Sequence, residues 1–254
     1  MTLALVKTLG VVLKEQDYKE NNKLLWIYTE KNGKITAIAK GAKKNSNKLF
    51  SASLPLTFGE YVLFKGRGLY TISEGKIVNS FRGCLDDLEK LTYSTYLCEL
   101  IDISMVDDES NAVLFKELVT SLYLLNSNAL DNEILIRAFE IKLLKATGYA
   151  LDLENCCKCK RRLSYCDYIS LAYSGGVCNR CEKSYGIPIS SSTYNILRYL
   201  NFYSLDNIYK LKINDNIKKE LYSIMKSLIG SIYQRRPKSL DMLDIIKESG
   251  DKNE

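Results

Sequence analysis

The residues best suited to chemistry are four cysteines that form two Cys-x-x-Cys pairs. The pairs are Cys156/Cys159 and Cys178/Cys181, and eighteen residues separate the inner cysteines. This spacing is typical of a four-thiolate zinc site. Zn²⁺ prefers a tetrahedron of soft ligands, and each Cys-x-x-Cys turn presents two sulfurs to one point. Because four sulfurs complete the shell, we expect one structural Zn²⁺ bound by these cysteines.

Two further cysteines, Cys157 and Cys166, lie in the same stretch, and we expect neither to bind the metal. Cys157 directly follows a ligand, where a second bond to one ion would distort the turn, and Cys166 has no paired cysteine. A cysteine-rich loop without metal and a redox-active Cys-x-x-Cys are the alternatives. The redox alternative is weakened because neither pair opens a helix after a strand, the setting that lowers a thiol pKa for exchange.

A short hairpin should bring the two pairs together. Residues 168–173 are typical of a strand, Ser174-Gly175-Gly176 of a turn, and Val177 begins the return to the second pair. The zinc module is therefore expected to span residues 156–186. Such ions contribute about 10–16 kcal/mol of apparent binding energy in small modules, enough to fold a segment that lacks its own core.

Composition favours a globular, non-enzymatic protein. The 254 residues are 46% apolar and 26% charged. The chain has no histidine, which excludes Ser-His-Asp and Cys-His nucleophile systems and His-ligated catalytic metals. Gly66-Arg67-Gly68 is a short hairpin turn rather than a phosphate-binding loop. Lys7 interrupts the apolar run at residues 3–13, which predicts a strand rather than a signal peptide, and hence a cytoplasmic protein with reduced thiols.

Charge is distributed unevenly along the chain. Residues 1–80 contain 13 Lys and Arg against 6 Asp and Glu, a charge of +7, whereas residues 81–155 contain 6 against 14, a charge of −8. Residues 156–186 carry +4 and residues 187–254 carry +3. A basic face is the electrostatic footprint of a polyanionic partner, and a merely solvated lysine-rich surface is the alternative.

The first eighty residues predict a small β-barrel. Short alternating or β-branched runs predict strands at residues 4–13, 24–29, 35–40, 61–65 and 69–73, with the last continuing towards 77–81. Asn32-Gly33 indicates a hairpin with a two-residue type I′ turn. Five short strands are too few for a sandwich, and no long helix could cover a sheet. We therefore expect an OB-type barrel.

The most basic stretch of the barrel lies between its third and fourth strands. Lysines there could contact phosphates without reading sequence, and Gly41 could let the backbone approach them. The expected DNA-binding residues are Lys40, Lys43, Lys44 and Lys48, with Arg67 and Arg82 as weaker candidates. Aromatic residues interleave with this face and could stack on bases, although most should pack in the core: Trp26, Tyr28, Phe50, Phe58 and Tyr61.

From residue 84 onward the apolar period becomes helical. Helices are expected from Leu88, at 111–125 and 131–146, after Ser190 and at 217–233, followed by a polar tail. The zinc module interrupts this helical part. The predicted fold class is thus α+β multidomain, with an OB-fold barrel at residues 1–82 and an α-helical domain at 83–254 that carries the four-cysteine module.

Several motifs, in this order, make the chain resemble the bacterial RecO family over nearly its whole length. They are Ile38-Ala39-Lys40-Gly41-Ala42-Lys43-Lys44, Gly59-Glu60, Lys65-Gly66-Arg67-Gly68-Leu69-Tyr70, Ser80-Phe81-Arg82, the first Cys-x-x-Cys, Gly175-Gly176-Val177-Cys178 and Cys181. One departure is Lys160, because family members often have glycine directly after the second zinc cysteine.

The resemblance implies a recombination mediator with no catalytic activity. Such a protein binds single- and double-stranded DNA, anneals complementary strands and, with RecR, helps to load RecA onto single strands coated by SSB. It also implies that the helical domain receives the SSB C-terminal tail, and that the protein acts in the cytoplasm at the nucleoid. An RNA-binding or translation-associated barrel with a zinc ribbon is the second hypothesis, and a thiol oxidoreductase is the third.

Overall fold

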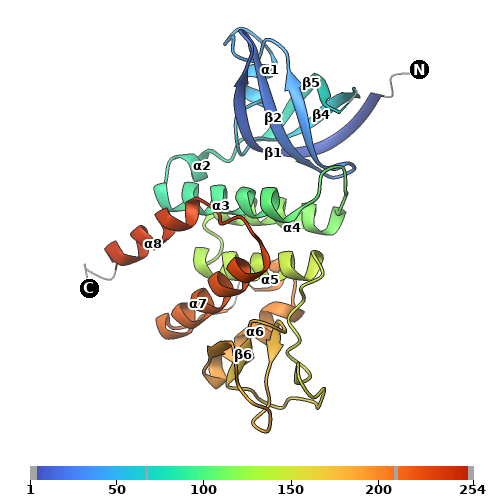
Figure 1. The fold of residues 1–254 in the computed structure, drawn as a ribbon. Helices are drawn as coiled ribbons and strands as arrows, with labels where there is room; N and C mark the ends of the chain where they lie inside the picture. Colours follow the sequence, from blue (N-terminus) through green and yellow to red (C-terminus); the bar gives the residue numbers. More distant parts are fainter. Residues whose placement is uncertain (1–4, 67, 209–210, 251–254) are drawn as a thin grey trace. The chain divides into compact units, whose positions relative to one another are not determined.

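The computed structural model of the chain describes residues 5–66, 68–208 and 211–250. Its N-terminal part is a closed five-stranded barrel, drawn in blue to cyan in Figure 1. The strands are β1 (Leu5–Tyr18), β2 (Asn22–Thr29), β3 (Gly33–Ala39), β4 (Phe58–Lys65) and β5 (Tyr70–Asn79). Their order is β1-β2-β3-β5-β4, β3 and β5 are parallel, and β1 closes the barrel by pairing with both β2 and β4. This topology confirms the expected OB-type barrel.

Alternation along the strands builds the barrel core. Leu25, Ile27 and Ile35 point inward and are at most 1% exposed. A short helix that the sequence did not indicate, α1 (Leu49–Ala52), adds Leu49 and Ala52 to the same core cluster. Each fully buried large aliphatic side chain contributes roughly 1.5–3 kcal/mol, so the alternation itself stabilises the closed barrel.

The β2–β3 hairpin is present, but its turn is not of type I′. Thr29 pairs with Gly33, which leaves three residues in the loop, and only Gly33 of the Asn32-Gly33 pair has a positive φ (64°). The Thr29 hydroxyl accepts from Asn32 N and donates to the Gly33 carbonyl. A Cβ on residue 33 would lie 1.9 Å from the Glu109 carbonyl oxygen. The Glu109 backbone therefore lies so close that only glycine fits at residue 33.

Four helices belong to the same compact unit as the barrel. They are α2 (Arg82–Leu85), α3 (Leu88–Ser104), α4 (Ala112–Ser127) and α8 (Ser239–Gly250). The expected polar tail is wrong, because α8 forms there and packs against α3. Leu240 and Leu243 are buried, and the Glu99 carboxylate accepts hydrogen bonds from both Ser239 N and its hydroxyl. Buried leucines three residues apart give α8 its apolar face.

The second compact unit spans Asn128–Arg236. It contains α5 (Asn132–Ala146), α6 (Ser191–Phe202), the 3₁₀ turn η1 (Leu205–Asn207) and α7 (Asp215–Ile232), with a small sheet of β6 (Tyr168–Ser170), β7 (Gly175–Gly176) and β8 (Gly186–Pro188). Asp131, Ser190 and Asn214 cap the three α-helices through side-chain oxygens. The helices expected as one domain at 83–254 are thus divided between two units. In the described ranges no helix is both long and apolar enough to cross a bilayer.

Candidate metal centre and nucleic-acid interface

Backbone hydrogen bonds shape the two Cys-x-x-Cys turns. In the first, Lys160 N donates to the Cys156 carbonyl and Cys156 N donates to the Arg161 carbonyl. In the second, Cys181 N donates to the Cys178 carbonyl. Lys160 has a φ of 61°, the left-handed conformation that glycine adopts without strain. Lys160 therefore occupies a backbone position that favours glycine.

The four expected ligands come together. The Sγ atoms of Cys156, Cys159, Cys178 and Cys181 all lie within 4.8 Å of one another. Cys156 and Cys181 sulfurs are 3.9 Å apart, and those of Cys159 and Cys178 are 3.7 Å apart. Tetrahedral bonds of about 2.3 Å to Zn²⁺ place sulfurs about 3.8 Å apart. The donor set and its spacing therefore fit a zinc ion, and all four sulfurs would be used.

Electrostatics at the cluster favours binding of a cation. Backbone and side-chain hydrogen bonds from Arg161 lower the pKa of Cys159 to about 6. Burial opposes ionisation of Cys156, but backbone N–H groups directed at its sulfur outweigh burial and lower its pKa. Hydrogen bonds with the Cys159 and Cys178 sulfurs raise the pKa of Cys181 to about 12, because they stabilise its protonated thiol. A divalent cation would replace this shared proton and let all four sulfurs ionise.

Cys157 and Cys166 lie outside this group. Both are buried, Cys157 Sγ is 3.6 Å from the Gly175 carbonyl oxygen, and burial raises the pKa of Cys166 to about 11. Gly175 and Gly176 form strand β7 rather than the expected turn, which lies at residues 171–174. A Cβ on Gly176 would be 2.9 Å from the Cys166 sulfur, so the glycines allow close packing of the module.

Intramolecular ion pairs engage several barrel lysines. The Lys14 ammonium is 2.6 Å from the Asp102 carboxylate, and Lys34 contacts both Asp102 and Asp107. Lys65 lies 3.4 Å from Asp108. These carboxylates belong to the acidic segment 81–155, within the same compact unit. Part of the basic charge of the N-terminal segment is therefore neutralised internally.

Other lysines line a groove on the barrel. The groove has a volume of about 1210 Å³, and its walls come from β1, β4, β5 and the segment between β3 and β4. Its charged residues are Lys7, Lys40, Lys48, Glu60, Glu74 and Lys76. Lys7 pairs with Glu60 at 2.9 Å, whereas Lys40, Lys48 and Lys76 form no ion pair with any residue that the structure describes. The groove therefore offers three ammonium groups without an ion pair, against one further carboxylate, Glu74.

The loop that carries the expected lysines is ordered by asparagines. Gly41 N donates to the Asn22 side chain, and the Asn47 side chain donates to the Lys40 carbonyl. Gly41 has a φ of 69°, and a Cβ there would be 2.5 Å from the Asn47 amide nitrogen. The backbone conformation and the packing against Asn47 therefore favour glycine at position 41 whether or not a phosphate approaches it. Lys43 pairs with Asp17 at 2.9 Å, whereas Lys44 is exposed.

Arg82 is exposed at the start of α2 and does not line the groove, and Arg67 lies outside the described residues. Tyr28, Phe58 and Tyr61 are buried, Lys14 covers the Trp26 ring at 4.6 Å, and Lys23 lies 5.5 Å from the Phe50 ring centre.

Sequence reasoning missed three groove residues, Lys7, Lys76 and Phe64. Phe64 is the partly exposed aromatic of the groove. The signal that could have found it is the alternation along β4, where Tyr61 and Leu63 face inward and Val62 and Phe64 face outward.

Comparisons with known proteins agree on one family. The model of the recombination protein O N-terminal domain matches residues 1–81, and that of the recombination protein O C-terminal domain matches residues 85–241. A DNA repair protein RecO of Clostridium perfringens strain 13 is 58% identical over 97% of this chain and its own full length. RecO of Clostridium acetobutylicum is 48% identical over 97% of this chain and the full length of the relative. RecO of Caldicellulosiruptor saccharolyticus is 31% identical over 95% of this chain and 99% of the relative.

Proposed function

The chain belongs to the bacterial RecO family of DNA repair proteins, and we propose from this premise that it is a DNA-binding recombination mediator without catalytic activity. It binds single- and double-stranded DNA, anneals complementary strands and acts in the cytoplasm at the nucleoid. With RecR, it helps to load RecA onto single strands coated by SSB, whose C-terminal tail binds the helical part. The observation that carries the DNA-binding proposal is the groove of the barrel with its three lysines that form no ion pair with a described residue.

Two features of the groove suit a flexible phosphate backbone. Lys40, Lys48 and Lys76 offer mobile ammonium groups on several walls, which can follow a strand without reading its sequence. Phe64 supplies an aromatic surface for a base. Lys44 extends the same basic loop, whereas Lys43 contributes less because Asp17 already neutralises it.

The four-cysteine cluster is proposed to bind one structural Zn²⁺. Its sulfur spacing fits tetrahedral coordination, and no further ligand is needed. When bound, the ion supplies folding energy to the segment 156–186 rather than a reactive group. The surrounding residues act by positioning: backbone N–H groups orient the sulfurs, and Gly175 and Gly176 permit the close approach of the strands.

One experiment tests the DNA-binding proposal. Binding of a fluorescent single-stranded oligonucleotide is measured at several salt concentrations for the wild type and for the Lys40→Ala, Lys48→Ala double variant. Each lost phosphate contact should flatten the slope of log affinity against log salt by about 0.7, so the double variant should lose about 1.4. Annealing of complementary oligonucleotides by the double variant should slow in parallel.

A matched control replaces two exposed lysines outside the groove, Lys116→Ala and Lys212→Ala. The control has the same net charge as the test variant. It therefore separates the loss of contacts in the groove from the general effect of a lower positive charge on DNA binding. An unchanged slope in the groove variant, or an equal change in the control, contradicts this assignment. A preference for RNA would favour the RNA-binding alternative.

A further inference from the structure

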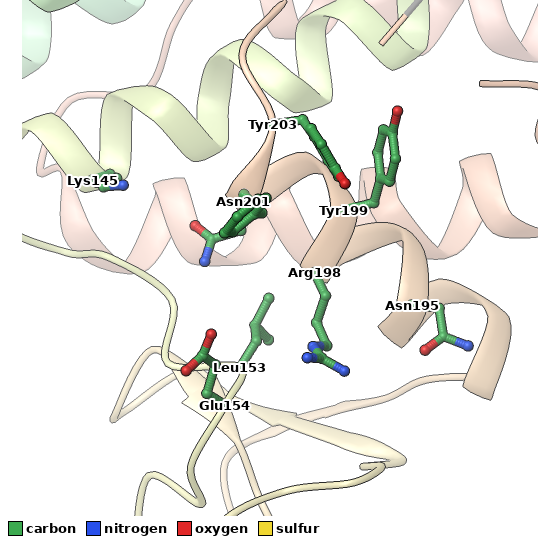
Figure 2. A pocket seen from close by; sticks show the side chains of 9 residues that line it. Lys145, Leu153, Glu154, Asn195, Arg198, Tyr199, Asn201 and Tyr203 are labelled. Atoms are coloured by element: carbon green, nitrogen blue, oxygen red, sulfur yellow. The ribbon is translucent and has the colours of Figure 1, made fainter. Parts of the chain in front are cut away.

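A pocket in the second unit has no role in the function proposed above. It lies beside α6 and has a volume of about 640 Å³ (Figure 2). The residues that matter for its chemistry are Lys145, Glu154, Asn195, Arg198, Asn201 and Phe202. Asn195, Arg198 and Phe202 are spaced by three and four residues and therefore share one face of α6, while Tyr194 and Leu197 are buried on the adjoining side.

Two cations of the pocket are available to an anion. Lys145 in the last turn of α5 and Arg198 on α6 are both exposed, and neither forms an ion pair with a described residue. The Arg198 guanidinium lies 5.7 Å from the ring centre of Tyr194, which supports it from beneath. The chain thus brings two cations that are far apart in sequence to one small pocket.

An exposed aromatic surface adjoins these cations. The Phe202 side chain is 79% exposed, the highest value among the large apolar residues that the structure describes. The Tyr203 ring meets Phe202 edge-on, with ring centres 5.1 Å apart, and Tyr199 lies 4.4 Å from Tyr203. An open aromatic ring held by its neighbours is suited to stacking on a planar partner.

One polar acceptor is open to the pocket, the Glu154 carboxylate. Figure 2 shows the Asn201 amide on the opposite wall, and the Asn201 side-chain oxygen is itself buried without a hydrogen-bond partner. The Glu154 carboxylate can accept from the amino groups of cytosine, adenine or guanine, which thymine lacks. A planar ring that carries an amino group suits both the Glu154 acceptor and the exposed Phe202 ring, whereas an acidic chain end offers Glu154 no donor of this kind.

We propose that this pocket binds one nucleotide of a single-stranded nucleic acid. Lys145 and Arg198 contact its phosphate, Phe202 stacks on its base, and Glu154 accepts from its amino group. The proposal deepens and rests on the proposed function, because a strand contact on the unit without the groove lets the chain hold a second strand during annealing.

The test uses the zinc-loaded full chain in a Lys40→Ala, Lys48→Ala background, which weakens the barrel site. Binding of labelled tetradeoxycytidylate is followed by fluorescence anisotropy. Adding Phe202→Ala should weaken binding about 5- to 150-fold, the loss expected for one stacked base. The control Tyr173→Ala removes an aromatic that is 61% exposed but does not line the pocket, and it should change nothing. Tetrathymidylate should bind at least fivefold more weakly, a difference that Glu154→Ala removes.

Equal binding by the Phe202 variant and the Tyr173 control would overturn the proposal, provided that zinc content and circular dichroism show both to be folded. It is also overturned if an acidic peptide with a free carboxyl terminus occupies the pocket and tetradeoxycytidylate fails to displace it. Failure of the barrel proposal is separate: the Lys40, Lys48 double variant would then bind long oligonucleotides as the wild type does, while the Phe202 effect persists.

Discussion

Replacing Lys160 by glycine should tighten zinc binding. Lys160 has a φ of 61°, and a non-glycine residue in the left-handed region costs roughly 1–2 kcal/mol. Glycine loses more backbone entropy on folding, which offsets roughly 0.5–1 kcal/mol. The variant also loses an ion pair with Asp152 whose atoms are 3.8 Å apart and whose lysine is 73% exposed, worth at most about 0.5 kcal/mol. The net gain is therefore about 0–1 kcal/mol over the wild type, and about 0.5–1 kcal/mol over Lys160→Ala, which lacks the same ion pair.

Zinc affinity is the quantity to measure, because folding of the turn is expected to be coupled to metal binding. The gain over Lys160→Ala corresponds to a zinc Kd about two- to fivefold lower, within reach of competition with a chromophoric chelator. Lys160→Ala is the control, since it removes the same charge but keeps a Cβ in the strained conformation. If the glycine variant bound zinc no more tightly than the alanine variant, backbone strain at this turn would not limit metal binding.

Two further predictions concern the same cluster. Protein prepared without added zinc should contain close to one equivalent, and Cys178→Ser should lose the metal and the folding of segment 156–186; unchanged metal content and stability would show that the ligand assignment is wrong. The Cys157→Ser, Cys166→Ser double variant should retain its zinc, because both sulfurs lie outside the four-sulfur group; metal analysis that found a loss would place one of them in the shell.

The barrel was predictable because its signals are local. The alternation of apolar and polar residues, the glycines between strands and the Asn32-Gly33 hairpin signal can each be recognised within a few residues of sequence. The parallel pairing of β3 with β5 joins Ala37 to Tyr70 and depends on closure of the whole barrel. Helix α8 was missed for a related reason. Its leucines stabilise a helix only because α3 supplies the apolar surface on which they pack. The Glu99 carboxylate, which accepts a hydrogen bond from Ser239 N, also lies far away in the sequence.

The clustering of the four cysteines could be predicted, but the packing of their hairpin could not. Cys-x-x-Cys spacing places two sulfurs within one turn, so two such motifs bring four sulfurs together. Gly175-Gly176 looked like a turn because glycine is frequent there. In the structure both glycines lie in β7, where any side chain would collide with Asp152, Leu163 or Cys166. The need for glycine at these positions comes from residues that pack against β7, and it cannot be read from the local sequence.

Charge counts along the sequence could not identify which lysines are available to bind a polyanion. The +7 of residues 1–80 and the −8 of residues 81–155 partly cancel within one compact unit, where Lys14, Lys34 and Lys65 meet carboxylates of residues 102–108. The lysines of the groove, by contrast, lie on walls that no carboxylate of that segment lines. Affinity for DNA should therefore respond to substitution at Lys40 and Lys48, and the ion-paired lysines should affect stability first, because their charge is already used inside the protein.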